Sequence, residues 1–302
     1  MVPGEIAGLR FVRLRNAAGE VRVGVLDGDE VGVLETGDIV ATLEADELPR
    51  AVERLTVLDH ESCTLPDPWQ LEVPLVAPET WAAGVTYRRS RDARLGESRV
   101  ADVYDLIYEA QRPELFLKDA GGRRTVGPGQ PIAIRADASW TVPEPELAVV
   151  LGSGGKPLAV TIGNDVSSRD IEGANPLYLP QAKIYAGACA LGPTLLVPVD
   201  WGAPFDIELR ILRADGQSVF EGATSTANMR RSREELIEFL LRDNPLPAGT
   251  VLLTGTGIVP PDELTLLPGQ SVEITIAGIG MLRNPVAASS KPEQPEEEAA
   301  HV

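Results

Sequence analysis

The chain has 302 residues, of which 43% are hydrophobic and 24% charged, a composition typical of folded globular proteins and not of disordered chains. Asp and Glu number 45 against 27 Lys and Arg, which gives a formal net charge of −18. Because so acidic a protein repels phosphate groups, neither nucleic acid nor an anionic membrane surface is an expected partner. The length suggests one large domain with a smaller one, or two domains.

Cysteine, histidine and apolar runs narrow the class of protein further. No apolar run approaches the roughly 18 residues of a membrane span, and the first residues lack the apolar core of a signal peptide. Cys63 and Cys189 form no Cys-x-x-Cys pair, which excludes a zinc ribbon and suits a reducing compartment. The two histidines, His60 and His301, rule out a histidine-rich metal site, so a metal here should be a hard one held by oxygen. We therefore expect a soluble, cytoplasmic protein.

The first part of the chain is expected to form a small domain. Residues 9–36 alternate polar and apolar side chains between turn-forming residues, which predicts two or three short antiparallel strands. Residues 39–55 favour one or two helices, interrupted near Pro49. A proline-rich stretch over 64–79 follows. These patterns predict a small, β-rich N-terminal α+β domain over residues 1–70.

Most of the remaining sequence has the pattern of strands and turns. The clearest helix is 232–242, where Ser232 and Glu235 form a capping box. The predicted fold class is therefore α+β, mainly β, with a main domain over residues 75–287. The last residues, 288–302, are rich in Pro, Glu and Ser and poor in apolar groups, so we expect a disordered acidic tail.

Three carboxylates are candidates for a metal site. Glu144 and Glu146 lie on one face of an extended strand in VPEPELAVVLG (142–152), and the apolar residues that follow predict a strand buried on both faces. Eighteen residues lie between Glu146 and Asp165, enough for a hairpin around the GSGG turn. Such a hairpin brings three carboxylates together in an oxygen-only site suited to Mg²⁺ or Mn²⁺. The alternative is a polar strand end and an Asp165 that only caps a helix.

Other stretches carry polar residues that suit an anionic ligand. Lys183 is isolated among apolar and small residues. If it is partly buried there, it is expected to have an anionic partner; the alternative is a lysine whose ammonium group reaches the surface. The segment 84–99 carries five arginines against two acidic residues and either clamps a carboxylate or forms a solvated helix face. Glu114 directly precedes an apolar run, where it is either a site carboxylate or the charged end of an ordinary strand. The glycines of TGTG (254–257) allow close approach of a ligand or form a bulge.

Taken together, these stretches resemble the fumarylacetoacetate hydrolase family over about residues 75–287. The motifs that carry the resemblance are, in order, PEPELAVVLG (143–152), IGNDVSSRD (162–170), QAKIYAGACALGP (181–193) and LLTGTGIVPP (252–261). The resemblance implies a mixed β-roll, a homodimer or dimer of dimers, and a divalent metal held by three carboxylates. By position these carboxylates match Glu144, Glu146 and Asp165, the trio already selected from the sequence pattern.

The resemblance also implies roles for residues near the metal. Lys183 matches the family's active-site lysine, Arg169 an arginine in the helix after the metal aspartate, and Thr256 the threonine of a glycine-rich turn near the substrate. The family's C–C hydrolases carry a water-activating histidine in the stretch that corresponds to 84–99, and this chain has none there. The segments GVTYRRSRDAR, RPELFLK and NPLYLPQAK resemble the family's dehydratases of arabinonate- or xylonate-derived 2-keto-3-deoxy acids more than its C–C hydrolases.

The resulting hypothesis is metal-dependent dehydration of a 2-keto-3-deoxypentonate to 2,5-dioxopentanoate. A metal chelated by the substrate's keto and carboxylate oxygens stabilises the enolate that forms on loss of a C3 proton, and this enolate expels the C4 hydroxyl. We predict Glu114 as the base and Lys183 as a catalytic cation. The predicted substrate-binding residues are Ser90, Arg91, Arg169 and Thr256.

Two alternatives stay open. A hydrolase, decarboxylase or isomerase acting on a diketo acid from aromatic-ring cleavage passes through a similar metal-bound enolate. A sugar-acid binding protein without catalytic activity is a further alternative on the same fold.

Overall fold

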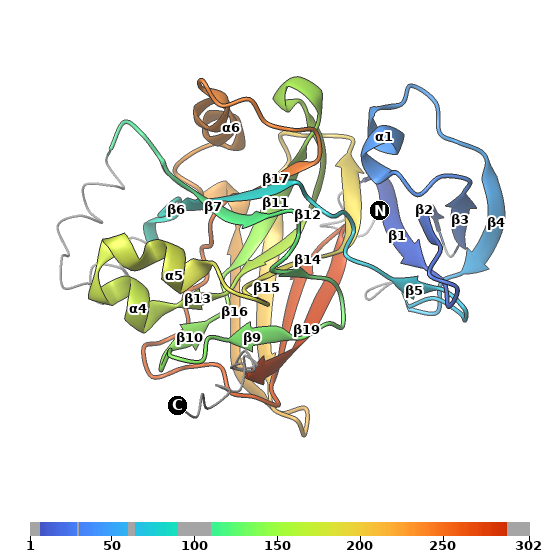
Figure 1. The fold of residues 1–302 in the computed structure, drawn as a ribbon. Helices are drawn as coiled ribbons and strands as arrows, with labels where there is room; N and C mark the ends of the chain where they lie inside the picture. Colours follow the sequence, from blue (N-terminus) through green and yellow to red (C-terminus); the bar gives the residue numbers. More distant parts are fainter. Residues whose placement is uncertain (1–6, 29, 60–63, 90–109, 289–302) are drawn as a thin grey trace, which may run out of the picture.

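The computed structural model describes residues 7–28, 30–59, 64–89 and 110–288, and strands are its predominant secondary structure (Figure 1). Twelve strands form a large sheet in the order β4-β3-β2-β1-β14-β12-β11-β17-β6-β7, with β5 beside β1 and β8 beside β14. Its N-terminal strands are β1 (Gly8–Arg15), β2 (Val21–Asp27), β3 (Glu30–Leu34), β4 (Ala51–Thr56) and β5 (Gln70–Leu71). Its other strands are β6 (Glu79–Gly84), β7 (Glu114–Ala120), β8 (Thr125–Val126), β11 (Pro145–Leu151), β12 (Pro157–Asp165), β14 (Cys189–Pro198) and β17 (Thr250–Leu253).

A second sheet and a few short helices complete the described structure. The second sheet has the order β16 (Ser218–Ser225), β15 (Asp206–Leu212), β18 (Ser271–Ile276), β19 (Gly280–Ala288) and β9 (Ile132–Ile134). A separate pair joins β10 (Thr141–Val142) to β13 (Ser167–Ser168). The α-helices are α1 (Ile39–Glu44), α4 (Arg169–Ala174), α5 (Leu179–Lys183) and α6 (Arg233–Leu241). Single 3₁₀ turns are η1 (Ser153–Gly155), η2 (Pro176–Tyr178) and η3 (Thr226–Asn228). Parallel and antiparallel pairs both occur, and the predicted class, α+β and mainly β, is confirmed.

The two sheets pack face to face around strand β11. Leu147 and Val149 of β11 join Ile207 and Ile274 of the second sheet in one buried cluster. Ala148 and Val150, whose side chains alternate with these, belong to a different cluster on the opposite face, together with Phe11 and Ile39. Strand β11 is therefore buried on both faces, as its unbroken apolar sequence predicts.

The hairpin that follows β11 has the predicted turn. Strands β11 and β12 are antiparallel, and the chain reverses through Gly152–Gly155. Gly154 and Gly155 have φ of +66° and +78°, a backbone conformation that favours glycine over other residues. Ser232 also caps α6 as predicted, because its Oγ accepts a hydrogen bond of 3.1 Å from the backbone N–H of Glu235.

The N-terminal strands extend the large sheet. Strand β1 pairs with β14 over Gly8–Phe11, and a separate apolar cluster that includes Leu14, Val31 and Trp69 lies among β1 to β5. The predicted helix over 39–55 is wrong beyond Glu44, since Ala51–Thr56 is strand β4, antiparallel to β3. Pairing with β3 and burial of Leu55 outweigh the local helical tendency of this stretch.

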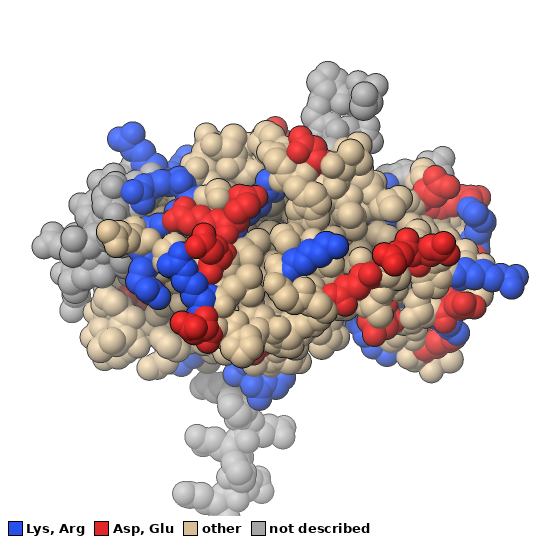
Figure 2. Space-filling model, turned by 90° about the horizontal axis from the view of Figure 1, so that it is seen from above, with Lys and Arg blue, Asp and Glu red and all other residues tan. Residues whose placement is uncertain are grey.

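The surface carries both signs of charge. In Figure 2, acidic and basic side chains are interspersed over the face that is drawn, and groups of acidic side chains lie over its right-hand part.

Among the described helices, none combines the length and the apolar character that a bilayer crossing requires. Ala288, assigned from sequence to the acidic tail, is the last residue of β19, and the rest of that predicted tail lies outside the described residues.

Candidate active site

The three predicted metal ligands meet at one end of the β11–β12 hairpin. Glu144 directly precedes β11, Glu146 is its second residue, and Asp165 is the last residue of β12. The backbone N–H of Asp165 donates to the carbonyl of Glu144 at 3.0 Å, which holds these two residues opposite one another. All three side chains are buried, and one carboxylate oxygen from each lies within 4.8 Å of the others. The convergence predicted from the sequence is therefore confirmed.

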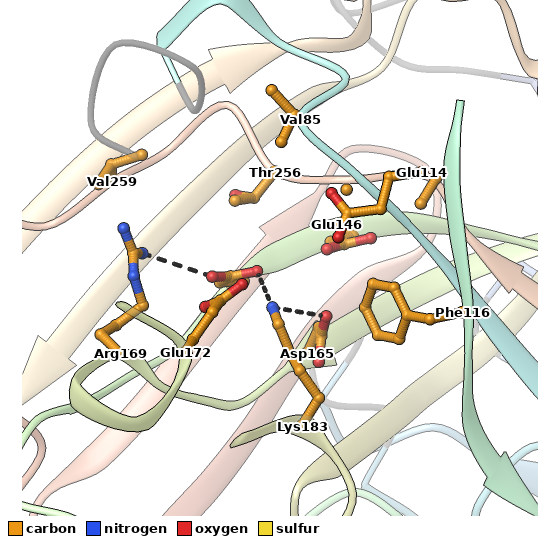
Figure 3. Close-up of a pocket in the computed structure, with 13 residues that line it drawn as sticks. Val85, Glu114, Phe116, Glu146, Asp165, Arg169, Glu172, Lys183, Thr256 and Val259 are labelled. Carbon is orange, nitrogen blue, oxygen red and sulfur yellow. Dashed lines mark hydrogen bonds and ion pairs between the residues drawn. The ribbon is translucent and has the colours of Figure 1, made fainter. Parts of the chain in front are cut away.

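Three buried cations balance the three carboxylates. The Nζ of Lys183 donates to Glu144 Oε2 at 2.8 Å, to Asp165 Oδ2 at 3.0 Å and to Ser167 Oγ at 2.6 Å. The guanidinium of Arg169 lies 3.4 Å from Glu144 Oε1 (Figure 3). Buried charges of one sign need such partners, because each loses its hydration in the interior.

The third cation, Lys118, is a residue that the sequence analysis did not select. Its side chain in β7 is 0% exposed. Its Nζ forms an ion pair with Asp165 Oδ1 and donates to the carbonyls of Val166 at 3.0 Å and Lys183 at 2.5 Å. Lys118 thus connects the two segments that supply Asp165 and Lys183. A lysine directly after the apolar run Leu115–Leu117 was the available indication, but its partners lie far along the chain.

The surroundings of Glu146 disfavour the ionised form of its carboxyl group. Burial, followed by the charges of Asp165 and Glu144, raises the pKa of its carboxyl well above the ordinary value. The backbone N–H of Gly255, in the glycine-rich segment after β17, donates to Glu146 Oε2 at 2.5 Å and opposes this rise. Three buried carboxylates, each with an oxygen within 4.8 Å of the others and with no nitrogen or sulfur ligand in the group, suit a hard divalent cation such as Mg²⁺.

Glu114 and Thr256 line the same pocket. Glu114 begins β7 and lies against Gly84 of the neighbouring strand β6, where a Cβ atom would collide with the Glu114 carboxylate. The glycine therefore leaves room for this carboxyl at the pocket, on the side of Glu146 away from Lys183 (Figure 3). The Thr256 Oγ1 accepts from the N–H of Ile258 at 3.2 Å, which orders the turn.

Helix α4 presents two buried charged side chains to the pocket. Arg169 and Glu172 are three residues apart on this helix, and each is 3% exposed. The Arg169 guanidinium also lies 5.7 Å from the ring centre of Trp140, which fixes its orientation. The sequence analysis gave Glu172 no role. Only the helical turn between 169 and 172 places it beside Arg169.

The structure thus brings together most of the predicted site. The described members are Glu114, Glu144, Glu146, Asp165, Arg169, Lys183 and Thr256, all lining one pocket. Ser90 and Arg91, the other predicted substrate-binding residues, lie outside the described residues.

Comparisons with known proteins agree with this geometry. A family model described as fumarylacetoacetate (FAA) hydrolase C-terminal matches residues 81–287. The chain is 44% identical over 278 residues to a 2-dehydro-3-deoxy-D-arabinonate dehydratase of Saccharolobus solfataricus, covering 88% of this chain and 92% of the relative. It is 48% identical over 215 residues to a probable 2-keto-3-deoxyxylonate dehydratase of Haloferax volcanii, covering 71% and 74% of the two chains.

A solved structure supports the same relationship. The structure of 2-keto-3-deoxy-D-arabinonate dehydratase complexed with magnesium and 2,5-dioxopentanoate matches with a TM-score of 0.82 and 40% identity. The match covers 93% of this chain and 100% of that chain.

Proposed function

The chain belongs to the fumarylacetoacetate hydrolase family, and on this premise we propose that it dehydrates a 2-keto-3-deoxypentonate to 2,5-dioxopentanoate with Mg²⁺ as its cofactor. The observation that carries the proposal is the buried trio of Glu144, Glu146 and Asp165 in a chain closely similar to two dehydratases of such acids. When bound, the divalent cation supplies a Lewis acid that draws electron density from the substrate's keto oxygen.

The trio would hold this cation, and the surrounding residues neutralise and orient the trio. Lys183 bonds to Glu144 and Asp165, Arg169 lies beside Glu144 and Lys118 pairs with Asp165, so these cations offset the charge of the trio itself. A divalent cation would also offset the further carboxyl groups of the pocket, Glu114 and Glu172. An anionic keto acid is the ligand that such a cation favours.

Glu114 is the proposed base. Its carboxyl lies at the pocket on a strand next to the one that ends in Gly84, and it is not one of the three clustered carboxylates. It would take the C3 proton, which the neighbouring keto group acidifies. The proposed contacts to the anionic substrate come from Lys183, Arg169, Thr256 and, outside the described residues, Ser90 and Arg91.

The test is turnover of 2-keto-3-deoxyarabinonate and 2-keto-3-deoxyxylonate, followed by NMR as appearance of an aldehyde. We expect turnover with Mg²⁺ and its loss with a chelator. Glu114→Gln should abolish turnover and leave Mn²⁺ binding unchanged. The matched control is Glu238→Gln, which makes the same change at an exposed carboxylate on α6. Full activity of Glu114→Gln would remove this residue from the mechanism.

The same assay distinguishes the alternative reactions. Formation of two carboxylate fragments from a ring-cleavage diketo acid would indicate a hydrolase, and loss of CO₂ a decarboxylase. A change of double-bond position without loss of water would indicate an isomerase. Tight binding of a keto acid without turnover in Mg²⁺ would indicate a binding protein.

Assembly and location complete the proposal. We propose a homodimer or a dimer of dimers in the cytoplasm, supported by the resemblance of the motifs and by the lack of paired cysteine motifs. Light scattering during size-exclusion chromatography tests the assembly, and a monomer at micromolar concentration would contradict it.

A further inference from the structure

Dehydration needs an acid as well as a base, because a hydroxyl group leaves readily only as water. We propose that Glu172 is this acid and gives its proton to the departing C4 hydroxyl. The inference rests on the proposed function and extends it by a residue. Its basis is the arrangement of proton donors around the trio.

The two lysines are bound to protein groups that they hold in place, so neither is the proposed proton donor. An ammonium group has three N–H donors. Those of Lys183 are used by Glu144, Asp165 and Ser167. Lys118 donates to two backbone carbonyls and forms an ion pair with Asp165. Both ammonium groups therefore hold the carboxylates and the loops in place.

Most of the other side chains that line the pocket are also excluded as the proton donor. A guanidinium does not release its proton in proteins, so Arg169 binds and orients but does not act as an acid. The Thr256 hydroxyl is a weak acid. The three clustered carboxylates are assigned to the cation. Among the described residues that line the pocket, Glu114 and Glu172 are the carboxyl groups that remain.

These two carboxyl groups come from different elements on different sides of the trio. Glu114 starts β7, whereas Glu172 belongs to α4 and is 3% exposed. Figure 3 shows Glu172 beside the carboxylate that bonds to Arg169 and Lys183, while Glu114 lies beyond Glu146. A keto acid seated over the trio would have one carboxyl group toward each end. This suits proton transfers at two adjacent carbons, C3 and C4.

The proposed elimination balances. Glu114 takes the C3 proton, the C3=C4 double bond forms, and the C4–O bond breaks as Glu172 gives its proton to the oxygen. The products are water and 5-hydroxy-2-oxopent-3-enoate. Glu172, now a carboxylate, next takes a proton from C5 while Glu114 returns its proton to C3. This second step yields the enol of 2,5-dioxopentanoate and restores both side chains.

The test separates the acid from the base with two substrates. On 2-keto-3-deoxyarabinonate, Glu172→Gln should lower kcat by about 10²- to 10⁴-fold with a small change in KM. On 2-oxopentanoate, which has no C4 hydroxyl, the same variant should exchange its C3 protons with D₂O within twofold of the wild-type rate. Glu114→Gln should lose both reactions, and Glu238→Gln should lose neither.

Each outcome bears on a different statement. If Glu172→Gln dehydrates the substrate at the wild-type rate, Glu172 is not the acid. If the variant loses both dehydration and C3 proton exchange, the proposal is also overturned, because that result indicates a structural role or a role as the base. A rise in KM with kcat unchanged also overturns it, in favour of substrate recognition. If Glu172→Gln fails to fold, Glu172→Asp should show the same selective loss to a smaller degree. A wild type that exchanges 2-oxopentanoate but dehydrates neither pentonate refutes the proposed function itself.

Discussion

Replacing Glu146 by Gln tests whether the trio is a cation site. Glu146 is 1% exposed, and burial together with the charges of Asp165 and Glu144 raises the pKa of its carboxyl. Glutamine has nearly the same shape and retains an oxygen that accepts the Gly255 N–H. The substitution therefore removes a charge and a potential metal ligand with little change in packing.

The expected stability change follows from the spacing of the charges. One oxygen of each carboxylate lies within 4.8 Å of the others, and two like charges at that limit repel by about 3.5 kcal/mol at an effective dielectric constant of about 20. Attraction to Lys183 offsets part of this repulsion, but the raised pKa shows that burial and repulsion outweigh it. Without metal, Glu146→Gln should therefore raise the free energy of unfolding by about 1–3 kcal/mol. With Mg²⁺ at 100 times its Kd, the wild type should gain about 2.7 kcal/mol, which the variant should lack.

The pH dependence gives a second readout. An unfolded glutamate ionises near its ordinary pKa of about 4.3, whereas folded Glu146 keeps its proton to higher pH. The unfolded state then binds fewer protons, so this group lowers the wild type's free energy of unfolding as pH rises from about 4.3 toward the raised pKa. The stability advantage of Glu146→Gln should grow over the same range.

The assay is urea unfolding followed by circular dichroism, with EDTA or MgCl₂, at several pH values between 5 and 8. Glu238→Gln is the control for loss of a carboxylate and should behave as the wild type. The reasoning is refuted if Glu146→Gln is less stable than the wild type in EDTA at pH 7. It is equally refuted if Mg²⁺ stabilises both proteins to the same degree.

Three further substitutions test the supports of the site. Lys118→Met leaves Asp165 and two carbonyls without their buried donor, and should lower the free energy of unfolding by about 3–5 kcal/mol in urea titrations. A loss below about 1 kcal/mol would show that the ion pair is not needed. Gly84→Ala should displace the Glu114 carboxylate and reduce turnover by about 10²-fold with Mn²⁺ binding unchanged; wild-type turnover contradicts this. Ser232→Ala should lower stability by about 1 kcal/mol through loss of the α6 cap and leave turnover unchanged, and equal urea midpoints would exclude the cap's contribution.

Much of the metal site could be predicted from the sequence because it depends on local patterns. Glu144 and Glu146 are two residues apart, and an extended strand places such residues on one face. The apolar run that follows and the GSGG turn predict a buried hairpin, which returns the chain to Asp165. Lys183 was selected by its isolation among apolar residues. These features need only strand periodicity, turn chemistry and the cost of burying a charge.

The tertiary structure decided which remote groups complete this site. Lys118 meets Asp165 because β7 passes beside the end of the hairpin, and the Gly255 N–H reaches Glu146 because β17 pairs with β11. The short strand β4 likewise forms against β3, where local composition favours a helix. Such contacts depend on the order of strands in the sheet. Local periodicity specifies the face of a strand on which each side chain lies, but it does not specify which distant segment packs beside it. These contacts could therefore not be derived from the sequence alone.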